Sequence, residues 1–190
     1  PAPVRAVLVR SSTHGLRQVG TALAVALAAT VGLAVFDRSQ PLGGLMADIG
    51  TATGERRSVV LPDQSLLHLN TRSAVDVAFD ARQRLLVLRD GEIHVETAHG
   101  RPVDPRPFIV STPQGSLRAL GTRFLVRRTD QGTELTVTEA AVAARPASCA
   151  PAPEAPCDAE RVVRAGETVL LRDEGLSLIR PAAPEADAWK

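Results

Sequence analysis

The stretch Ala119-Leu120-Gly121-Thr122-Arg123-Phe124-Leu125-Val126 has the pattern of a β-strand that is interrupted by a Gly-Thr pair. Glycine inside a strand pattern weakens the strand and usually marks a bulge or a close approach of two backbones. The pair also places the Thr122 hydroxyl directly after a carbonyl group that no side chain shields. We therefore expect this stretch to mark an irregular point of the backbone inside a β domain.

The sequence on both sides of this stretch predicts an all-β domain. Short runs of apolar and β-branched residues alternate with turn residues at regular spacing, and the runs show no helical period. This pattern is typical of a sandwich, a jelly roll or a short β-solenoid. The expected strands are Ser58–Leu61, Leu66–Asn70, Ala74–Phe79, Arg84–Arg89, Glu92–Thr97, Phe108–Thr112, Leu117–Leu120, Phe124–Arg127, Glu134–Thr138, Val142–Arg145, Val162–Arg164, Thr168–Arg172 and Leu176–Ile179.

The strongest short hairpin signal of the chain is the dipeptide Asp90-Gly91. It lies between the expected strands 84–89 and 92–97, which we therefore predict to pair with each other. In the second of these strands apolar residues alternate with Glu92, His94 and Glu96, which predicts one buried face and one solvated face.

The composition limits the classes of partner. The chain has 22 Lys and Arg against 21 Asp and Glu, and aromatic residues make up 3 % of it. A balanced charge does not attract nucleic acid, and few aromatic side chains disfavour a stacking platform for single strands. We therefore expect no nucleic-acid partner, and we expect a core that consists of Val, Leu and Ile.

Residues 19–36 contain no charged side chain and form a candidate transmembrane helix. Three arginines precede this segment, and the positive-inside rule then places the N-terminus in the cytoplasm and the following domain in the periplasm. The alternative is a secretory signal peptide, with Gly32-Leu33-Ala34 as its small-residue cleavage site. Both alternatives place the following domain outside the cytoplasm.

The sequence predicts five regions. Residues 1–18 are a cytoplasmic N-terminal remnant, residues 19–36 the single-pass helix in the bacterial inner membrane, and residues 37–46 a linker. Residues 47–180 form the periplasmic β domain, and residues 181–190 form a tail.

Both cysteines lie in a Pro- and Ala-rich insertion at residues 146–160. In an oxidising compartment Cys149 and Cys157 can form a disulfide across a short loop. Free thiols are a second alternative. Metal binding is the weakest, because no histidine lies near them and the spacing is unusual for zinc.

Six segments, in this order, resemble the FecR family. They are residues 54–65 (GERRSVVLPDQS), 69–75 (LNTRSAV), 88–92 (LRDGE), 106–110 (RPFIV), 119–126 (ALGTRFLV) and 136–139 (TVTE). The resemblance covers about residues 50–145 and extends to residues 160–180. Gln64 and Ala140 stand where the family usually has glycine, which suggests altered turns, and the insertion at 146–160 is not part of the family pattern.

The resemblance implies an inner-membrane signal transducer that regulates a sigma factor of the extracytoplasmic-function (ECF) class. In such systems the periplasmic signalling domain of a TonB-dependent transporter, often for iron–siderophores, passes the signal to the FecR-like protein. The implied partners are this transporter, the sigma factor through a missing or truncated N-terminal domain, the inner membrane, and periplasmic and intramembrane proteases. The alternative function is an anchored or secreted binding module for a glycan or cell-surface ligand.

Some members of the family resemble self-cleaving proteins at the Gly-Thr bond. The resemblance therefore makes Gly121 and Thr122 candidates for a single-turnover cleavage by an N–O acyl shift. The structural alternative is that Gly121 is a bulge residue and Thr122 an ordinary strand residue.

The remaining polar residues indicate neither an enzyme nor a cofactor or metal site. His68 and His94 are expected at the surface, and His94 and His99 are not expected to converge on a metal. The pairs Arg56-Arg57 and Arg127-Arg128 are expected on solvated strand faces, with docking of a periplasmic partner as the alternative.

Overall fold

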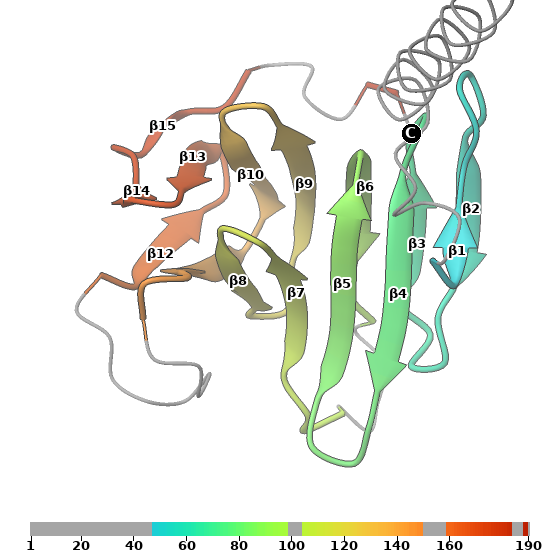
Figure 1. The fold of residues 1–190 in the computed structure, drawn as a ribbon. Coiled ribbons are helices and arrows are strands. Elements are labelled where there is room, and N and C mark those ends of the chain that lie inside the picture. Colours follow the sequence, from blue (N-terminus) through green and yellow to red (C-terminus); the bar gives the residue numbers. More distant parts are fainter. Residues whose placement is uncertain (1–46, 99–103, 150–158, 184–187, 190) are drawn as a thin grey trace, which may run out of the picture. The chain divides into compact units, whose positions relative to one another are not determined.

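The computed structural model describes residues 47–98, 104–149, 159–183 and 188–189 (Figure 1). Within them the backbone forms strands and turns without a helix, so the all-β prediction is confirmed for this part of the chain. The strands are β1 (Ile49–Gly50), β2 (Arg57–Val60), β3 (Leu66–Leu69), β4 (Ala74–Phe79), β5 (Arg84–Asp90), β6 (Glu92–Glu96), β7 (Phe108–Thr112), β8 (Gly115–Ala119), β9 (Arg123–Thr129), β10 (Gly132–Glu139), β11 (Ala141–Pro146), β12 (Arg161–Arg164), β13 (Glu167–Arg172), β14 (Gly175–Leu176) and β15 (Arg180–Pro181).

The described residues contain no helix that is long and apolar enough to cross a membrane. The predicted transmembrane segment at residues 19–36 lies outside the described part of the chain, as do residues 1–18 and the linker 37–46.

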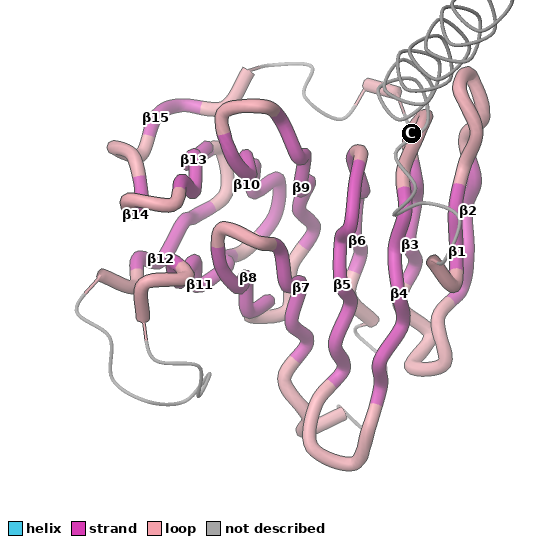
Figure 2. Tube along the Cα trace, viewed as in Figure 1, coloured by secondary structure: helices cyan, strands magenta, loops and turns pink. Residues whose placement is uncertain are grey.

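The strands form two open sheets (Figure 2). The first sheet has the order β1-β4-β5-β7-β8-β11-β12, and the second has the order β14-β13-β10-β9-β6-β3-β2, with β15 also paired to β13. All pairs are antiparallel except β5 with β7. The chain passes repeatedly from one sheet to the other, after β1, β3, β5, β6, β8, β10 and β12, so the two sheets are built up together along the chain.

One hydrophobic core lies between the two sheets. Side chains alternate along the longer strands, and about every second residue of these strands points into this core. Phe108 and Phe124 are the two aromatic residues among the largest fully buried side chains, and the others are mostly Leu, Ile and Val, as the composition predicted. A core of branched aliphatic side chains suits the pleated surfaces of two facing sheets.

The predicted hairpin at Asp90-Gly91 is wrong. β5 pairs with β4 and β7, whereas β6 pairs with β3 and β9, so the chain crosses from one sheet to the other at Gly91. Gly91 has φ +81°, and a Cβ there would lie 2.4 Å from Ser73 Oγ. The glycine therefore serves a tight corner between sheets, which shares the local sequence signal of a two-residue hairpin.

The hydroxyl of Ser73 stabilises this corner. It donates to the carbonyl of Glu92 at 2.9 Å and accepts from the N–H of the same residue at 3.0 Å. The carbonyl of Gly91 accepts from the N–H of Arg128 at 2.8 Å, which connects the corner to β9. The backbone groups that a hairpin would have paired are thus satisfied by β9 and by one side chain.

The insertion at residues 146–160 connects two paired strands. β11 and β12 lie side by side in antiparallel register, from Ala141 opposite Arg164 to Ala144 opposite Arg161. At the C-terminal end β15 includes Pro181, one residue beyond the expected end of the domain at residue 180.

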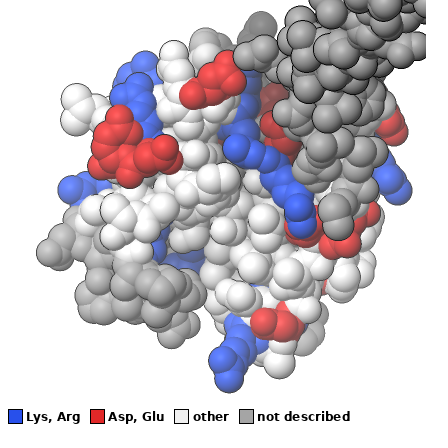
Figure 3. All heavy atoms as spheres, viewed as in Figure 1, with Lys and Arg blue, Asp and Glu red and all other residues white. Residues whose placement is uncertain are grey.

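Figure 3 shows that acidic and basic groups lie next to one another on the face it presents. Neither sign of charge gathers into one continuous area on that face, and uncharged residues occupy its centre.

Candidate functional site

The Gly-Thr pair lies in the connection between β8 and β9, which belong to different sheets. The stretch 119–126 is therefore two strand segments joined by a corner rather than one interrupted strand. Gly121 has φ +75°, the left-handed region, and a Cβ on it would meet no atom within 4 Å. The glycine is thus required by its backbone conformation and not by the space around it.

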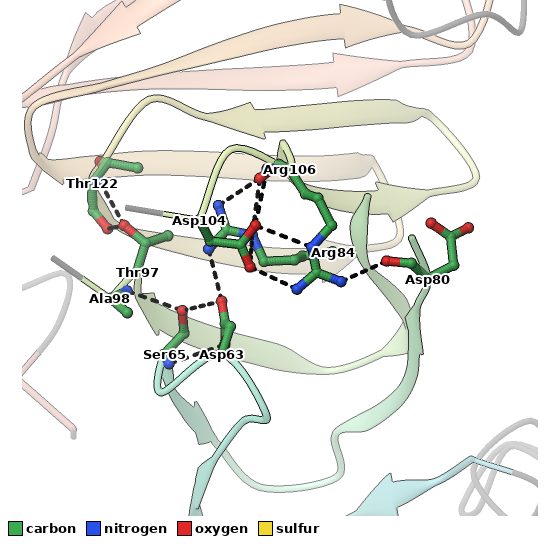
Figure 4. A network of polar contacts seen from close by, with 9 residues as sticks. All are labelled: Asp63, Ser65, Asp80, Arg84, Thr97, Ala98, Asp104, Arg106 and Thr122. Atoms are coloured by element: carbon green, nitrogen blue, oxygen red, sulfur yellow. Dashed lines mark hydrogen bonds and ion pairs between the residues drawn. The ribbon is translucent and has the colours of Figure 1, made fainter. Parts of the chain in front are cut away.

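Thr122 is fully buried and is held by the backbone and hydroxyl of Thr97 (Figure 4). The N–H of Thr122 donates to Thr97 Oγ1 at 2.8 Å, and the Thr122 carbonyl accepts from both the N–H and the hydroxyl of Thr97 at 3.1 Å. The Thr122 hydroxyl donates to the carbonyl of Glu139 and lies 3.3 Å from the carbonyl of Arg123. The backbone N–H and the carbonyl of Thr122 are therefore both fixed by Thr97, the residue that directly follows β6.

A chain of hydrogen bonds leads from Thr97 to the turn after β2. The N–H of Ala98 donates to Ser65 Oγ at 3.0 Å, and the Ser65 hydroxyl donates to Asp63 Oδ2 at 2.7 Å. Asp63 also accepts from the N–H of Ser65 at 3.0 Å, and its side chain is fully buried. Within this turn Gln64 has φ +67°, a conformation that glycine adopts more readily.

Arg84 joins this turn to the start of β7. Its Nη1 donates to Asp63 at 2.8 Å, and its Nε and Nη2 donate to the carbonyl of Arg106 at 3.0 and 2.7 Å. The guanidinium lies 5.4 Å from the centre of the Phe108 ring, a distance at which cation and ring attract. One side chain on β5 therefore connects two loops that are far apart in the sequence.

Arg106 extends the network toward the solvent. It pairs with Asp104, with 2.6 Å between Nη2 and Oδ2, and its Nη1 donates to the carbonyl of Asp80 at 2.5 Å. The hydrogen bonds from the side chain and backbone of Arg106 lower the pKa of Asp104 well below its usual value. The backbone N–H groups of Arg82 and Gln83 likewise lower the pKa of Asp80.

These two carboxylates predict a loss of stability in acid. Because their pKa values are lower in the folded than in the unfolded chain, the stability they contribute is complete above about pH 4 and is lost as the pH falls through the folded values. We expect the melting temperature to fall between about pH 4 and pH 2. The variant Asp104→Asn should show a shallower fall in the same thermal scans, and an unchanged slope would contradict this assignment.

The structure corrects the expectation that both histidines lie at the surface. His94 is fully buried, and the side chain of His68 is 17 % exposed. The two residues are register partners on β6 and β3, and their ring centres lie 5.6 Å apart. Each ring covers part of the other, which the alternation within one strand did not reveal.

The other predicted side chains are placed as follows. Arg56, Arg57 and Arg127 are exposed and Arg128 is half-buried. Cys149 is disulfide-bonded. Cys157 lies outside the described residues, so its pairing with Cys149 stays a prediction, and the same holds for any role of His99.

The sequence model of the FecR protein family matches residues 47–143, which is half of the chain. The chain belongs to the FecR family. The matched region begins just before β1 and ends within β11, so it contains both the Gly-Thr corner and the whole polar network of Figure 4. Strands β12 to β15 lie beyond the matched region.

Two crystal structures of proteins from Parabacteroides distasonis, each described as a putative anti-sigma factor, share the fold. The first has a TM-score of 0.59 and 24 % identity over 74 % of this chain and 63 % of its own. The second has a TM-score of 0.56 and 23 % identity over 72 % and 60 % of the two chains. The chain thus spans about three fifths of the length of these neighbours. A search of curated proteins finds no match.

Three of the segments that resembled the FecR family meet in the network. The turn with Asp63 and Ser65, the Arg106 segment and the Gly-Thr corner are brought together by Arg84 and Thr97, neither of which the sequence had marked as a site residue. Gln64 and Ala140 both have positive φ, at +67° and +57°. The turns therefore keep the glycine-type conformation although their side chains differ from the family pattern.

Proposed function

We propose that this FecR-family chain regulates an ECF sigma factor from the bacterial inner membrane, with the β domain in the periplasm. The support is the family match over residues 47–143, together with a fold shared with two putative anti-sigma factors. In this proposal the β domain receives a signal from the periplasmic domain of a TonB-dependent transporter, of the kind that takes up iron–siderophores. Residues 19–36 anchor the chain, and proteases of the periplasm and membrane complete the signal.

The observation that carries this proposal is the match of the FecR family model over residues 47–143. Within the matched region, separate family segments converge on one buried ion pair and on the Gly-Thr corner. Asp63 and Arg84 have side chains that are 0 % and 10 % exposed and 2.8 Å apart. Such a network fixes the relative positions of the loops around residues 63, 98 and 122, so a signal received at one loop can affect the others.

The alternative of a glycan-binding module has less support. Sugar sites commonly use exposed aromatic rings, whereas among the described residues Phe108 and Phe124 are fully buried, Phe79 packs against the core and Trp189 is half-buried. Among the described residues, the pocket on the outer face of the second sheet has a volume of about 310 Å³ and is lined by charged side chains and threonines together with Leu125, Pro181 and Ala183.

Co-expression tests the regulatory role. The full-length gene product, including whatever precedes residue 1, is co-expressed with each ECF sigma factor of the same bacterium and purified from membranes. We expect one sigma factor to co-purify, and to be lost when the segment that precedes the membrane helix is deleted. Failure of every sigma factor to bind would contradict the proposal.

We further propose that the bond between Gly121 and Thr122 is cleaved once by the chain itself. The Thr122 hydroxyl oxygen attacks the Gly121 carbonyl carbon, the C–N bond breaks, and the nitrogen takes the hydroxyl proton. The ester that results is hydrolysed by water, which leaves a carboxylate on Gly121 and restores the hydroxyl of Thr122.

Two observations favour this reaction. Gly121 has a left-handed backbone and is exposed, so its peptide unit is in a sparsely populated conformation and is accessible to water. The amide nitrogen and carbonyl of Thr122 are held by Thr97, so its hydroxyl has only to rotate away from the Glu139 carbonyl. After cleavage the fragments stay joined, because β8 pairs with β11 and β9 pairs with β6.

Mass spectrometry of the purified chain checks this prediction. We expect two fragments, the second beginning at Thr122, that co-elute under native conditions and separate on a denaturing gel. Thr122→Ser should still be cleaved because it keeps the hydroxyl, whereas Thr122→Val should remain intact. A wild-type chain that is found only at full length would overturn the proposal.

A further inference from the structure

We propose that His68, His94 and Glu96 form a zinc-binding site on the outer face of the second sheet. His68 and His94 are register partners on the neighbouring strands β3 and β6, and Glu96 follows His94 by two residues. Residues two apart on a strand share a face, and partners across strands lie next to each other. The topology therefore brings two imidazoles and one carboxylate to one spot.

The distances between the three ligand atoms suit a tetrahedral metal. Glu96 Oε1 lies 3.7 Å from His68 Nε2 and 3.7 Å from His94 Nδ1, and all three atoms lie within 4.8 Å of one another. Zinc bonds of about 2.0–2.1 Å place neighbouring tetrahedral ligands about 3.4 Å apart. Small side-chain rotations are enough to close this arrangement around one ion.

A hydroxyl group orients the first histidine. Ser58 Oγ lies 2.8 Å from His68 Nδ1, so a proton on Nδ1 can be donated to the serine while Nε2 presents its lone pair to the metal. Ser58 is the register partner of His68 on β2 and is exposed. Ligating histidines are commonly fixed in this way by a hydrogen bond at the other ring nitrogen.

The nearby charges leave one oxygen of Glu96 for the metal. Arg123 Nε lies 3.2 Å from Glu96 Oε2, whereas the 3.7 Å distances from the two histidines are to Glu96 Oε1. Arg123 also pairs with Glu139 at 3.2 Å, so two carboxylates face this one guanidinium. The two carboxylates and the one guanidinium together carry a net negative charge, which favours a cation between the two histidines and Glu96.

The exposure of the ligands predicts an accessible site with an open position. The side chains of His68 and Glu96 are 17 % and 27 % exposed, which gives an ion a path from solvent, and His94 forms the buried side. Three protein ligands leave the fourth position for water. The site also lies next to the Gly-Thr corner, because Arg123 directly follows Thr122 and Thr97 directly follows Glu96.

Titration of the 190-residue chain with Zn²⁺ tests the proposal. Calorimetry should show one ion per chain, and Co²⁺ in its place should give the visible absorption of a four-coordinate nitrogen and oxygen site. We expect His68→Gln and Glu96→Gln each to weaken Zn²⁺ binding at least about tenfold, and Ser58→Ala about tenfold. Glu139→Gln is the matched control, because it removes the other carboxylate partner of Arg123 but no proposed ligand. Its affinity for Zn²⁺ should stay within about twofold of the wild-type value.

The outcomes separate this site from the other histidines of the chain. Thermal scans without metal verify that each variant is folded. If a histidine variant does not fold, the exposed Ser58→Ala change still tests the site. Absence of Zn²⁺ binding would overturn the proposal. So would binding that His68→Gln, Glu96→Gln and Ser58→Ala leave unchanged, because the ion would then be held elsewhere.

Discussion

Replacing Arg84 by alanine is expected to lower the free energy of unfolding by about 3–5 kcal/mol. The substitution leaves the fully buried carboxylate of Asp63 without its cation and the carbonyl of Arg106 without its two donors. It also removes the guanidinium that lies over the Phe108 ring. Urea denaturation followed by circular dichroism measures the change.

Two control variants make this test specific. Arg82→Ala removes a neighbouring exposed arginine and should change stability by no more than about 0.5 kcal/mol. Arg84→Lys keeps the charge but loses the planar guanidinium. Its free energy of unfolding should therefore lie between those of the wild type and Arg84→Ala. A loss below about 1 kcal/mol for Arg84→Ala would show that the network does not hold the loops together.

Replacing Gly91 by alanine is expected to destabilise the domain by about 2–5 kcal/mol, from backbone strain and overpacking together. The residue has φ +81°, and the added methyl would lie 2.4 Å from Ser73 Oγ and 2.5 Å from the carbonyl oxygen of Arg72. The corner would have to open, and the two hydrogen bonds between Ser73 and Glu92 would lengthen.

Gly54→Ala is the matched control for this prediction. Gly54 has nearly the same φ, +82°, but a Cβ there would meet no atom within 4 Å. The free energy of unfolding of Gly54→Ala should therefore fall only by the cost of a left-handed backbone at alanine, about 1 kcal/mol. If both variants lost the same free energy of unfolding, the close contacts around Gly91 would contribute nothing to stability. That result would contradict the prediction that the corner between the sheets requires a glycine.

Strand positions could be predicted from the sequence because a half-buried strand has a local signature. The runs at 74–79 and 108–112 were predicted with the bounds that the structure shows, and most others differ by one or two residues. Alternation identified Ile93 and Val95 as core residues, and both are fully buried.

Strand pairing could not be predicted in the same way, because it depends on contacts between distant residues. Asp90-Gly91 has the local chemistry of a hairpin, yet its conformation is decided by Ser73 and by β9. His94 lies on the face that alternation marked as exposed, but its register partner His68 lies against it.

The candidate site depended on distant contacts as well. The Gly-Thr pair was visible as an irregular point in a strand pattern, but its hydrogen-bond partner Thr97 is separated from Thr122 by 25 positions. Arg84 and Asp63 are 21 positions apart, and neither pattern nor spacing indicates their ion pair. The FecR resemblance identified the segments that take part, and the structure shows what joins them.

The regulatory role is tested most directly by transcription in the bacterium that carries this gene. A reporter driven by the promoter of the co-purifying sigma factor is measured in the wild-type strain, in a deletion strain, and in that strain complemented with wild type or with the destabilised Arg84→Ala variant. We predict that deletion changes reporter activity several-fold, that the wild-type gene restores it, and that the Arg84→Ala gene does not. Equal reporter activity in all four strains would contradict the assignment of this FecR-family chain as a sigma-factor regulator.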